Sequence, residues 1–77
     1  MAPVEELRVY KELKEYRLLK SREEKIKPYF LYNDNQLREL VQKVPKSREE
    51  LLEVNGFGLA KVSKYGDDII RIVKAFG

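Results

Sequence analysis

The chain has 77 residues with a formal net charge of +3, of which 43% are hydrophobic and 38% charged. This length leaves room for one compact domain, expected over residues 1–77, and excludes a large enclosed active site. Because His and Cys are absent, disulfides, the common zinc sites and thiol or imidazole catalysis are excluded. We expect a folded, non-catalytic domain without cofactor or metal, and no apolar run approaches the roughly 18 residues of a membrane span.

The charge is spread along the chain. Residues 1–28 carry eight bases and six acids, residues 29–55 four and five, and residues 56–77 four and two, which gives +2, −1 and +2. A strong nucleic-acid binder usually shows a denser Lys and Arg stripe. Charge alone therefore leaves solvated helix faces and a polyanionic partner both open.

A long amphipathic helix is predicted from Pro3 to about Glu24. Pro3 suits the first turn, where its missing N–H would be unpaired anyway. Strong helix formers follow, and apolar residues recur at three- and four-residue spacing. The expected contacts are Val4, Leu7, Val9, Tyr10, Leu13, Tyr16 and Leu18.

Pro28 ends this helix, because the residue before a proline is pushed out of helical geometry. Residues 26–32 are then expected to cross the domain as an extended apolar segment. Phe30 and Leu31 are expected to pack under the first helix. For Tyr29, packing and ligand binding are both open.

Two short helices are expected next. Asp34 is the expected cap of a helix at about residues 35–43, and Pro45 marks the following break. Ser47 and Glu50 fit the Ser-x-x-Glu capping box, in which hydroxyl and carboxylate satisfy each other's backbone donors. This box predicts a third helix that carries Leu51, Leu52 and Val54.

Two more helices complete an all-α fold of five short helices. A fourth is expected over about residues 59–65, capped by Gly66, and a fifth with Asp67 and Asp68 in its first turn. Its expected buried face consists of Ile69, Ile70, Ile72, Val73 and Phe76. No strand pattern competes.

Two helices joined by a Gly-apolar-Gly turn resemble the helix-hairpin-helix motif of DNA binders without sequence specificity. Here the turn is Gly56, Phe57 and Gly58. Glycines leave the backbone amides bare at the start of the next helix, where a phosphate can bind. Lys61 and Lys64 would add charge. The turn also serves as a plain tight connection, and Phe57 is expected in the core in both interpretations.

A second group places an aromatic ring beside two lysines at a rigid break. It consists of Lys25, Lys27, Pro28 and Tyr29. Stacking of a base on an aromatic ring is worth ~1–3 kcal/mol for any sequence, and lysines neutralise phosphates. The group is therefore suited to single-stranded DNA, with packing of Tyr29 as the alternative.

Together these motifs resemble the HRDC domain, the helicase and RNase D C-terminal module, and most closely that of bacterial RecQ-type helicases. The resemblance covers about residues 6–75 and rests on Tyr16-Arg17, residues 26–29, Asn33-Asp34, Leu37 to Leu40, Pro45, residues 51–58 and Lys64-Tyr65-Gly66. It implies a five-helix bundle that serves as an auxiliary DNA-binding or regulatory module without catalysis of its own.

The resemblance also implies residue roles. In the bacterial RecQ-type member the aromatic residue after the proline belongs to a single-strand surface, and here that residue is Tyr29. The usual pattern is Pro-Pro-aromatic, but Lys27 replaces the first proline and adds a charge. Arg17 is expected to anchor the fold. The candidate DNA-binding residues are Tyr29, Lys27, Lys25, Gly56, Gly58, Lys61 and Lys64.

The leading functional hypothesis is weak, largely sequence-independent binding of single-stranded or partly duplex DNA. The parent is expected to be an ATP-dependent DNA helicase acting in repair and recombination, cytoplasmic or nucleoid-associated, which extends beyond Met1 and Gly77. An RNase D-type parent would instead imply RNA. The alternative is a monomeric module that docks on other domains of its parent, which an exposed apolar patch would favour.

Overall fold

The computed structural model describes residues 3–76, and the side chains of residues 6–75. Met1, Ala2 and Gly77 lie outside this range. The described chain forms four α-helices and one 3-10 turn and contains no strand, so the all-α prediction is confirmed. The elements are α1 (Pro3–Glu24), η1 (Pro28–Phe30), α2 (Asp34–Lys43), α3 (Arg48–Leu52) and α4 (Leu59–Phe76). No described helix has the length and apolar character needed to cross a membrane.

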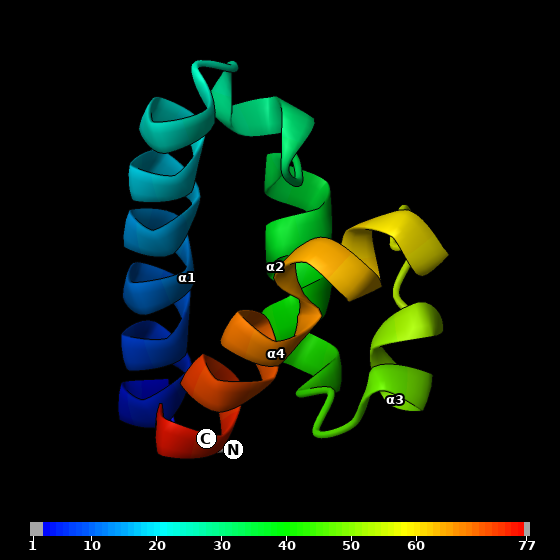
Figure 1. The fold of residues 1–77 in the computed structure, drawn as a ribbon. Coiled ribbons are helices and arrows are strands. Elements are labelled where there is room, and N and C mark those ends of the chain that lie inside the picture. The colour runs from blue at the N-terminus through cyan, green and yellow to red at the C-terminus, as the bar shows by residue number, and fades with distance from the viewer. Residues whose placement is uncertain (1–2, 77) are drawn as a thin grey trace.

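Helices α2 and α4 pack against α1, the longest helix. The chain turns at η1, and α2 then returns beside α1 (Figure 1). The last helix, α4, packs against both α1 and α3. The core between them consists of Val9, Leu13, Leu31, Tyr32, Leu37, Leu40, Val41, Leu51, Val54, Phe57, Val62, Tyr65, Ile69 and Val73.

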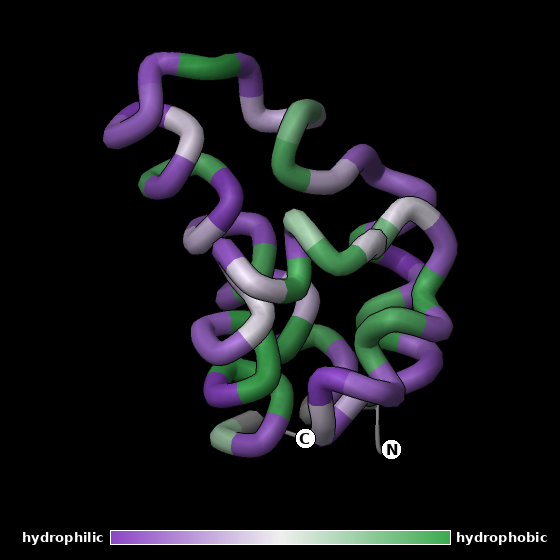
Figure 2. The backbone as a smooth tube through the Cα atoms, turned by 45° about the vertical axis from the view of Figure 1, so that its right-hand side comes forward, coloured by the Kyte–Doolittle hydropathy of each residue, from purple (hydrophilic) through white to green (hydrophobic). Residues whose placement is uncertain are grey.

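The bounds predicted for the first helix are confirmed, but its buried face is narrower than predicted. Val9 and Leu13 are fully buried, whereas Leu7 and Leu18 are 59% and 41% exposed. Helix α1 lies at the surface and meets its neighbours along one stripe only, so apolar residues off that stripe face water. Hydrophobic and hydrophilic segments alternate along the backbone in Figure 2. Val4 lies outside the described side chains.

The cap of α2 is Asn33, so the prediction of Asp34 is wrong by one position. Asn33 Oδ1 accepts from Gln36 N at 2.8 Å, and Gln36 Oε1 accepts from Asn33 N at 2.8 Å. Asn33 rather than Asp34 caps the helix because only Asn33 has a Gln three residues later to complete the reciprocal pair of hydrogen bonds. Asp34 is the first residue of α2 and pairs with Arg17 instead.

Helix α3 begins as its capping motif predicts, but only half of the motif forms. Ser47 Oγ accepts from Glu50 N at 3.1 Å, which confirms Ser47 as the cap. The Glu50 carboxylate accepts from Lys46 N at 3.1 Å rather than from the backbone of Ser47. The first turn of α3 is thus tied to the residue before its cap.

The fourth and fifth predicted helices are one continuous helix, so the five-helix count and the Gly66 cap are wrong. Gly66 is buried within α4, where an added Cβ would lie 3.4 Å from Leu51 Cδ2 and 3.1 Å from Val62 Cγ1. The tighter of these two contacts is to Val62 of the same helix, and Gly66 lies inside α4 rather than ending a helix.

The aspartates expected to begin the fifth helix tie α4 to its neighbours instead. Asp67 pairs with Arg48 of α3 at 2.9 Å, and Asp68 accepts from Tyr16 of α1 at 2.8 Å. Burial, together with this bond, raises the pKa of the Tyr16 hydroxyl. The Phe76 side chain, predicted to be buried, lies outside the described side chains.

Candidate nucleic-acid interface

The chain reverses sharply after α1. Ile26 N donates to Ser21 O at 2.9 Å, and Lys25 adopts a left-handed φ of 57°, the geometry of a Schellman helix end. Lys27 is extended, with φ −74° and ψ 144°, as expected before a proline. We name the residues displayed at this reversal, Lys25, Ile26, Lys27, Tyr29 and Phe30, the aromatic corner.

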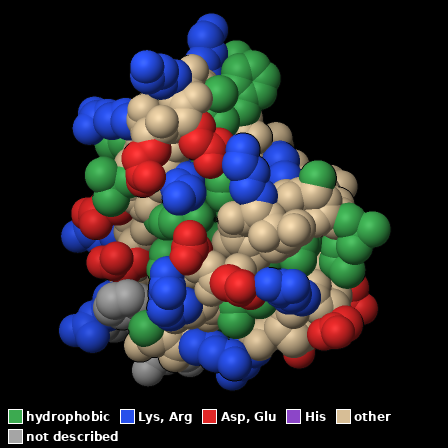
Figure 3. All heavy atoms as spheres, in the orientation of Figure 1, with side chains coloured by type: hydrophobic (Ala, Val, Ile, Leu, Met, Phe, Trp, Pro, Cys, Tyr) green, Lys and Arg blue, Asp and Glu red, His purple; other side chains and the backbone are tan. Residues whose placement is uncertain are grey.

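Two aromatic rings of the corner face water. Tyr29 and Phe30 are 55% and 56% exposed, and their ring centroids lie 4.9 Å apart at an interplanar angle of 35°. The prediction that Phe30 packs under the first helix is wrong, whereas Leu31 is fully buried as predicted. The predicted extended segment over residues 26–32 is also wrong, because residues 28–30 form a 3-10 turn with about three residues per turn. The chain therefore enters the core only at Leu31. Figure 3 shows exposed hydrophobic side chains beside Lys and Arg at this end.

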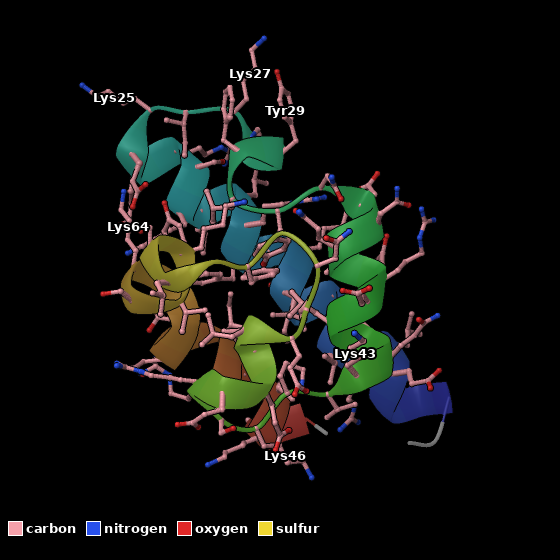
Figure 4. The ribbon with its side chains drawn as sticks, turned by 90° about the vertical axis from the view of Figure 1, so that its right-hand side faces the viewer. Lys25, Lys27, Tyr29, Lys43, Lys46 and Lys64 are labelled. Atoms are coloured by element: carbon pink, nitrogen blue, oxygen red, sulfur yellow. The ribbon has the colours of Figure 1, made fainter. Side chains whose placement is uncertain are left out.

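The two lysines of the corner have no acidic partner among the described side chains. Lys25 and Lys27 are both exposed, and neither forms an ion pair with residues 6–75. Lys27 Nζ lies 5.9 Å from the Tyr29 ring centroid. In Figure 4 Lys25, Lys27 and Tyr29 all point away from the body of the molecule at one end.

A buried anchor holds the corner in place. Arg17 donates to Tyr32 O at 3.0 Å and to Asp34 Oδ1 at 3.1 Å, and its guanidinium carbon lies 5.7 Å from the Tyr32 ring centroid. The Tyr32 hydroxyl donates to Leu13 O, and burial raises its pKa. Arg17 thus anchors the fold, as predicted, and ties the chain directly after η1 to α1.

The two glycines between α3 and α4 differ in their surroundings. Gly56 has a φ of +88°, and a Cβ there would collide with the Gln36 side chain. Gly58 has no atom within 4 Å of an added Cβ, and its carbonyl accepts from Val62 N at 3.0 Å. Phe57 between them is 3% exposed, which confirms it as a core residue. We name residues 55–58 the glycine turn.

Of the two lysines after the glycine turn, only Lys64 has an acidic partner among the described side chains. Lys61 Nζ lies 5.8 Å from the Phe57 ring centroid, and Lys64 Nζ pairs with Glu24 Oε1 at 3.0 Å. The Tyr65 hydroxyl donates to the same carboxylate at 2.5 Å. These two hydrogen bonds, that of Tyr65 first, hold the pKa of Glu24 below its ordinary value.

The predicted site residues therefore fall into two groups. Lys25, Lys27 and Tyr29 share the aromatic corner, whereas Gly56, Gly58 and Lys61 belong to the glycine turn and the start of α4. Lys64 reaches the end of α1 through Glu24 and lies on the side of Lys25 in Figure 4.

Two surface features were missed by the sequence analysis. The first is the exposed ring of Phe30, for which the one signal was its position at the end of a proline-started turn. The second is a depression of about 470 Å³ on the outer face of α1, whose apolar lining residues Leu7, Tyr10 and Leu18 were predicted to face the core. It is lined by Leu7, Tyr10, Lys11, Lys14, Glu15 and Leu18.

Comparison with known proteins identifies the family. The model of the HRDC domain matches residues 6–73. The chain belongs to the HRDC family. It is 36% identical over 56 residues to ATP-dependent DNA helicase Q-like 4B of Arabidopsis thaliana, covering 73% of this chain and 5% of that helicase.

Two bacterial relatives are also helicases by name. ATP-dependent DNA helicase RecQ of Haemophilus influenzae is 35% identical over 51 residues, covering 66% of this chain and 8% of the helicase. ATP-dependent DNA helicase UvrD2 of Mycobacterium tuberculosis is 29% identical over 63 residues, with 82% and 9% covered. This HRDC chain thus spans less than a tenth of each relative's length, and no solved structure matches it significantly.

Proposed function

We propose that this HRDC domain is a non-catalytic, auxiliary DNA-binding module of a DNA helicase and that the aromatic corner is its binding surface. The observation that carries the proposal is the exposed ring of Tyr29 beside Lys25 and Lys27, neither of which has an acidic partner among the described side chains. The names of the relatives favour DNA over RNA.

Each group at the corner has a separate role in the proposed binding. A base stacks on Tyr29, which any base can do because every base has a π-face. Lys25 and Lys27 bind the neighbouring phosphates, so affinity falls as salt rises. Because neither stacking nor phosphate contacts read base identity, sequence preference is slight.

Weak binding is sufficient for a tethered module. Once the parent holds a strand, contact with the domain becomes intramolecular, at an effective concentration of roughly millimolar for a short flexible linker. The domain then keeps the strand near the motor rather than capturing it from solution. This explains how a surface of one ring and two lysines can be useful.

Fluorescence anisotropy with a labelled 15-nucleotide single strand tests the proposal. Tyr29→Ala is expected to raise Kd about 5- to 150-fold, the equivalent of one lost stacking contact, and Tyr29→Phe to leave Kd nearly unchanged because the ring remains. Binding by the wild type is expected to weaken from low to physiological salt. Absence of binding at low salt, or equal Kd values for wild type and Tyr29→Ala, would overturn the proposal.

The second candidate is docking on another domain of the parent helicase. It is favoured by the depression on α1, where Leu7 and Leu18 are 59% and 41% exposed. Within the parent, Leu18→Asp would then alter unwinding while Tyr29→Ala would not. The opposite pattern is expected if the aromatic corner is the working surface.

A further inference from the structure

We infer that Phe30 is a second stacking face, so that the aromatic corner holds two neighbouring, unpaired bases of a single strand. This inference rests on the proposed function and narrows its substrate to strands with two adjacent free bases. It assigns a binding role to a residue that its apolar sequence context had placed in the core.

Phe30 is the exposed member of a contrasting pair. It is 56% exposed, whereas Phe57 is 3% exposed. Burying a phenylalanine side chain is worth about 1.5–3 kcal/mol, so a ring left in water forgoes stabilisation that the same residue type supplies elsewhere in this domain. Phe30 lies beside a second exposed ring, that of Tyr29, so the corner presents two adjacent aromatic side chains to water.

The geometry of the two rings determines how bases can use them. Their centroids are 4.9 Å apart, whereas a base held between two rings needs about 7 Å, twice the ~3.4 Å spacing of a stacked strand. No base can therefore enter between Tyr29 and Phe30. Each ring can accept a base only on a face turned away from the other.

The tilt between the rings selects single strands. Because the ring planes meet at 35°, two bases lying flat on them cannot remain parallel to each other. Neighbouring bases must unstack, which a paired duplex resists and a single strand allows at little cost. The corner therefore fits two splayed bases rather than a duplex end.

The backbone beneath the rings is already ordered. Phe30 N donates to Lys27 O and Leu31 N to Pro28 O, both at 3.0 Å, and Leu31 and Tyr32 are fully buried directly after the turn. Little backbone freedom is then lost when bases arrive, which favours binding. Lys27 Nζ, 5.9 Å from the Tyr29 ring centroid, is placed to move from the ring to a phosphate as a base stacks.

Two 15-nucleotide strands with the same number of phosphates test the inference. One is oligothymidylate, and the other alternates thymidine with abasic sites, so that no two bases are adjacent. Wild-type protein is expected to bind the first at least about fivefold more tightly, the equivalent of one stacked base. Phe30→Ala is expected to reduce the ratio of the two Kd values to about twofold, the value expected when only the number of bases is halved. Phe30→Tyr is expected to keep the wild-type ratio.

Controls separate stacking from other losses. Phe30→Leu keeps an apolar side chain but removes the ring, and it is expected to behave like Phe30→Ala. Leu19→Ala changes a side chain of matched exposure, 60%, in α1, and should leave both Kd values unchanged. Thermal unfolding of each variant verifies that the fold is intact.

The outcomes distinguish this inference from the proposed function. If Tyr29→Ala weakens binding but Phe30→Ala and Phe30→Leu keep the wild-type preference for adjacent bases, Phe30 is no platform and the inference fails alone. If wild-type protein binds neither strand, or Tyr29→Ala binds as tightly as wild type, the proposed function itself fails.

Discussion

The aromatic corner and the glycine turn contain similar residues, but the first exposes its aromatic rings and the second buries its ring. Each follows a helix and combines an aromatic residue with a conformational break and nearby lysines. In the corner Tyr29 and Phe30 remain exposed, while in the turn Phe57 is buried among the helices. Whether an aromatic residue beside a conformational break is exposed or buried therefore depends on the helices that pack around it, not on the local sequence.

The lysines of the two regions also differ, in whether they have an acidic partner. Lys25 and Lys27 are without acidic partners among the described side chains, whereas Lys64 is paired with Glu24. A phosphate that bound Lys64 would have to compete with a carboxylate already in place. Under the proposed function we therefore expect a phosphate to bind the corner more tightly than Lys64, although both segments carry binding motifs in the sequence.

Replacing the phenylalanine of each region gives the largest expected contrast. Phe57→Ala removes a ring from the core and is expected to cost about 3–5 kcal/mol of unfolding free energy, a large part of the roughly 4–12 kcal/mol available to 77 residues. Phe30→Ala is expected to change stability by less than about 0.5 kcal/mol, as for other exposed positions. Denaturant unfolding measures both, and equal losses would contradict the contrast.

The two glycines of the turn are expected to respond differently to a single methyl group. Gly56→Ala places a side chain at φ +88° and against Gln36, and is expected to cost about 1–3 kcal/mol. Gly58→Ala meets open space and should change stability by less than about 1 kcal/mol. Thermal unfolding checks these values. If Gly58→Ala kept its stability but lost DNA binding, the turn rather than the corner would hold phosphates.

Local signals explain most of the fold that could be predicted. Pro3, Pro28 and Ser47 act on their own neighbours, and the bounds of α1 and the start of α3 followed from them. Gly66 could not be interpreted in this way, because it lies inside α4 and packs near Leu51, a residue 15 positions earlier in the sequence that only the tertiary fold brings close.

The same distinction governs the site. The group of Lys25, Lys27 and Tyr29 could be predicted because a proline-fixed segment brings sequence neighbours together. The pairing of Lys64 could not be predicted, because its partner Glu24 belongs to a helix far away in the sequence. The same carboxylate accepts from Tyr65, 41 positions from Glu24. Exposure of Phe30 also depended on which residues the remaining helices brought into the core.

Replacing single lysines tests whether the corner lysines contribute more to phosphate binding than the paired Lys64. Lys25→Ala and Lys27→Ala are each expected to weaken binding and to reduce the slope of log K against log salt by about 0.7, the value for one phosphate contact with a single strand. Lys64→Ala is expected to have a smaller effect, because Glu24 already neutralises this lysine. Anisotropy titrations at several salt concentrations measure the slopes.

A matched lysine at the far end of the molecule serves as control. Lys43 closes α2 and lies away from the corner in Figure 4. Lys43→Ala lowers the net charge by the same amount but should leave the slope unchanged. An equal loss of slope for Lys43→Ala would show that binding follows net charge, not the aromatic corner.

The smallest expected effect comes from Glu24→Gln, which removes the carboxylate that distinguishes the two regions. Hydrogen bonds from Tyr65 and then Lys64 hold the pKa of Glu24 below its ordinary value of 4.5. The charged carboxylate therefore stabilises the fold above about pH 4.5, and this contribution is lost as the pH falls through the lower, folded-state pKa. Wild type should be more stable than the variant near pH 7, and this difference should vanish in acid.

The same variant should make Lys64 behave more like the lysines of the corner. With Glu24 neutral, Lys64 becomes free for phosphate, and the salt slope is expected to steepen by up to about 0.7. Glu53→Gln is the control, because it adds the same net charge on an exposed side chain outside the Lys64 pair. A stability difference that persisted at all pH values, or equal slopes for the two variants, would show that Glu24 does not restrain Lys64.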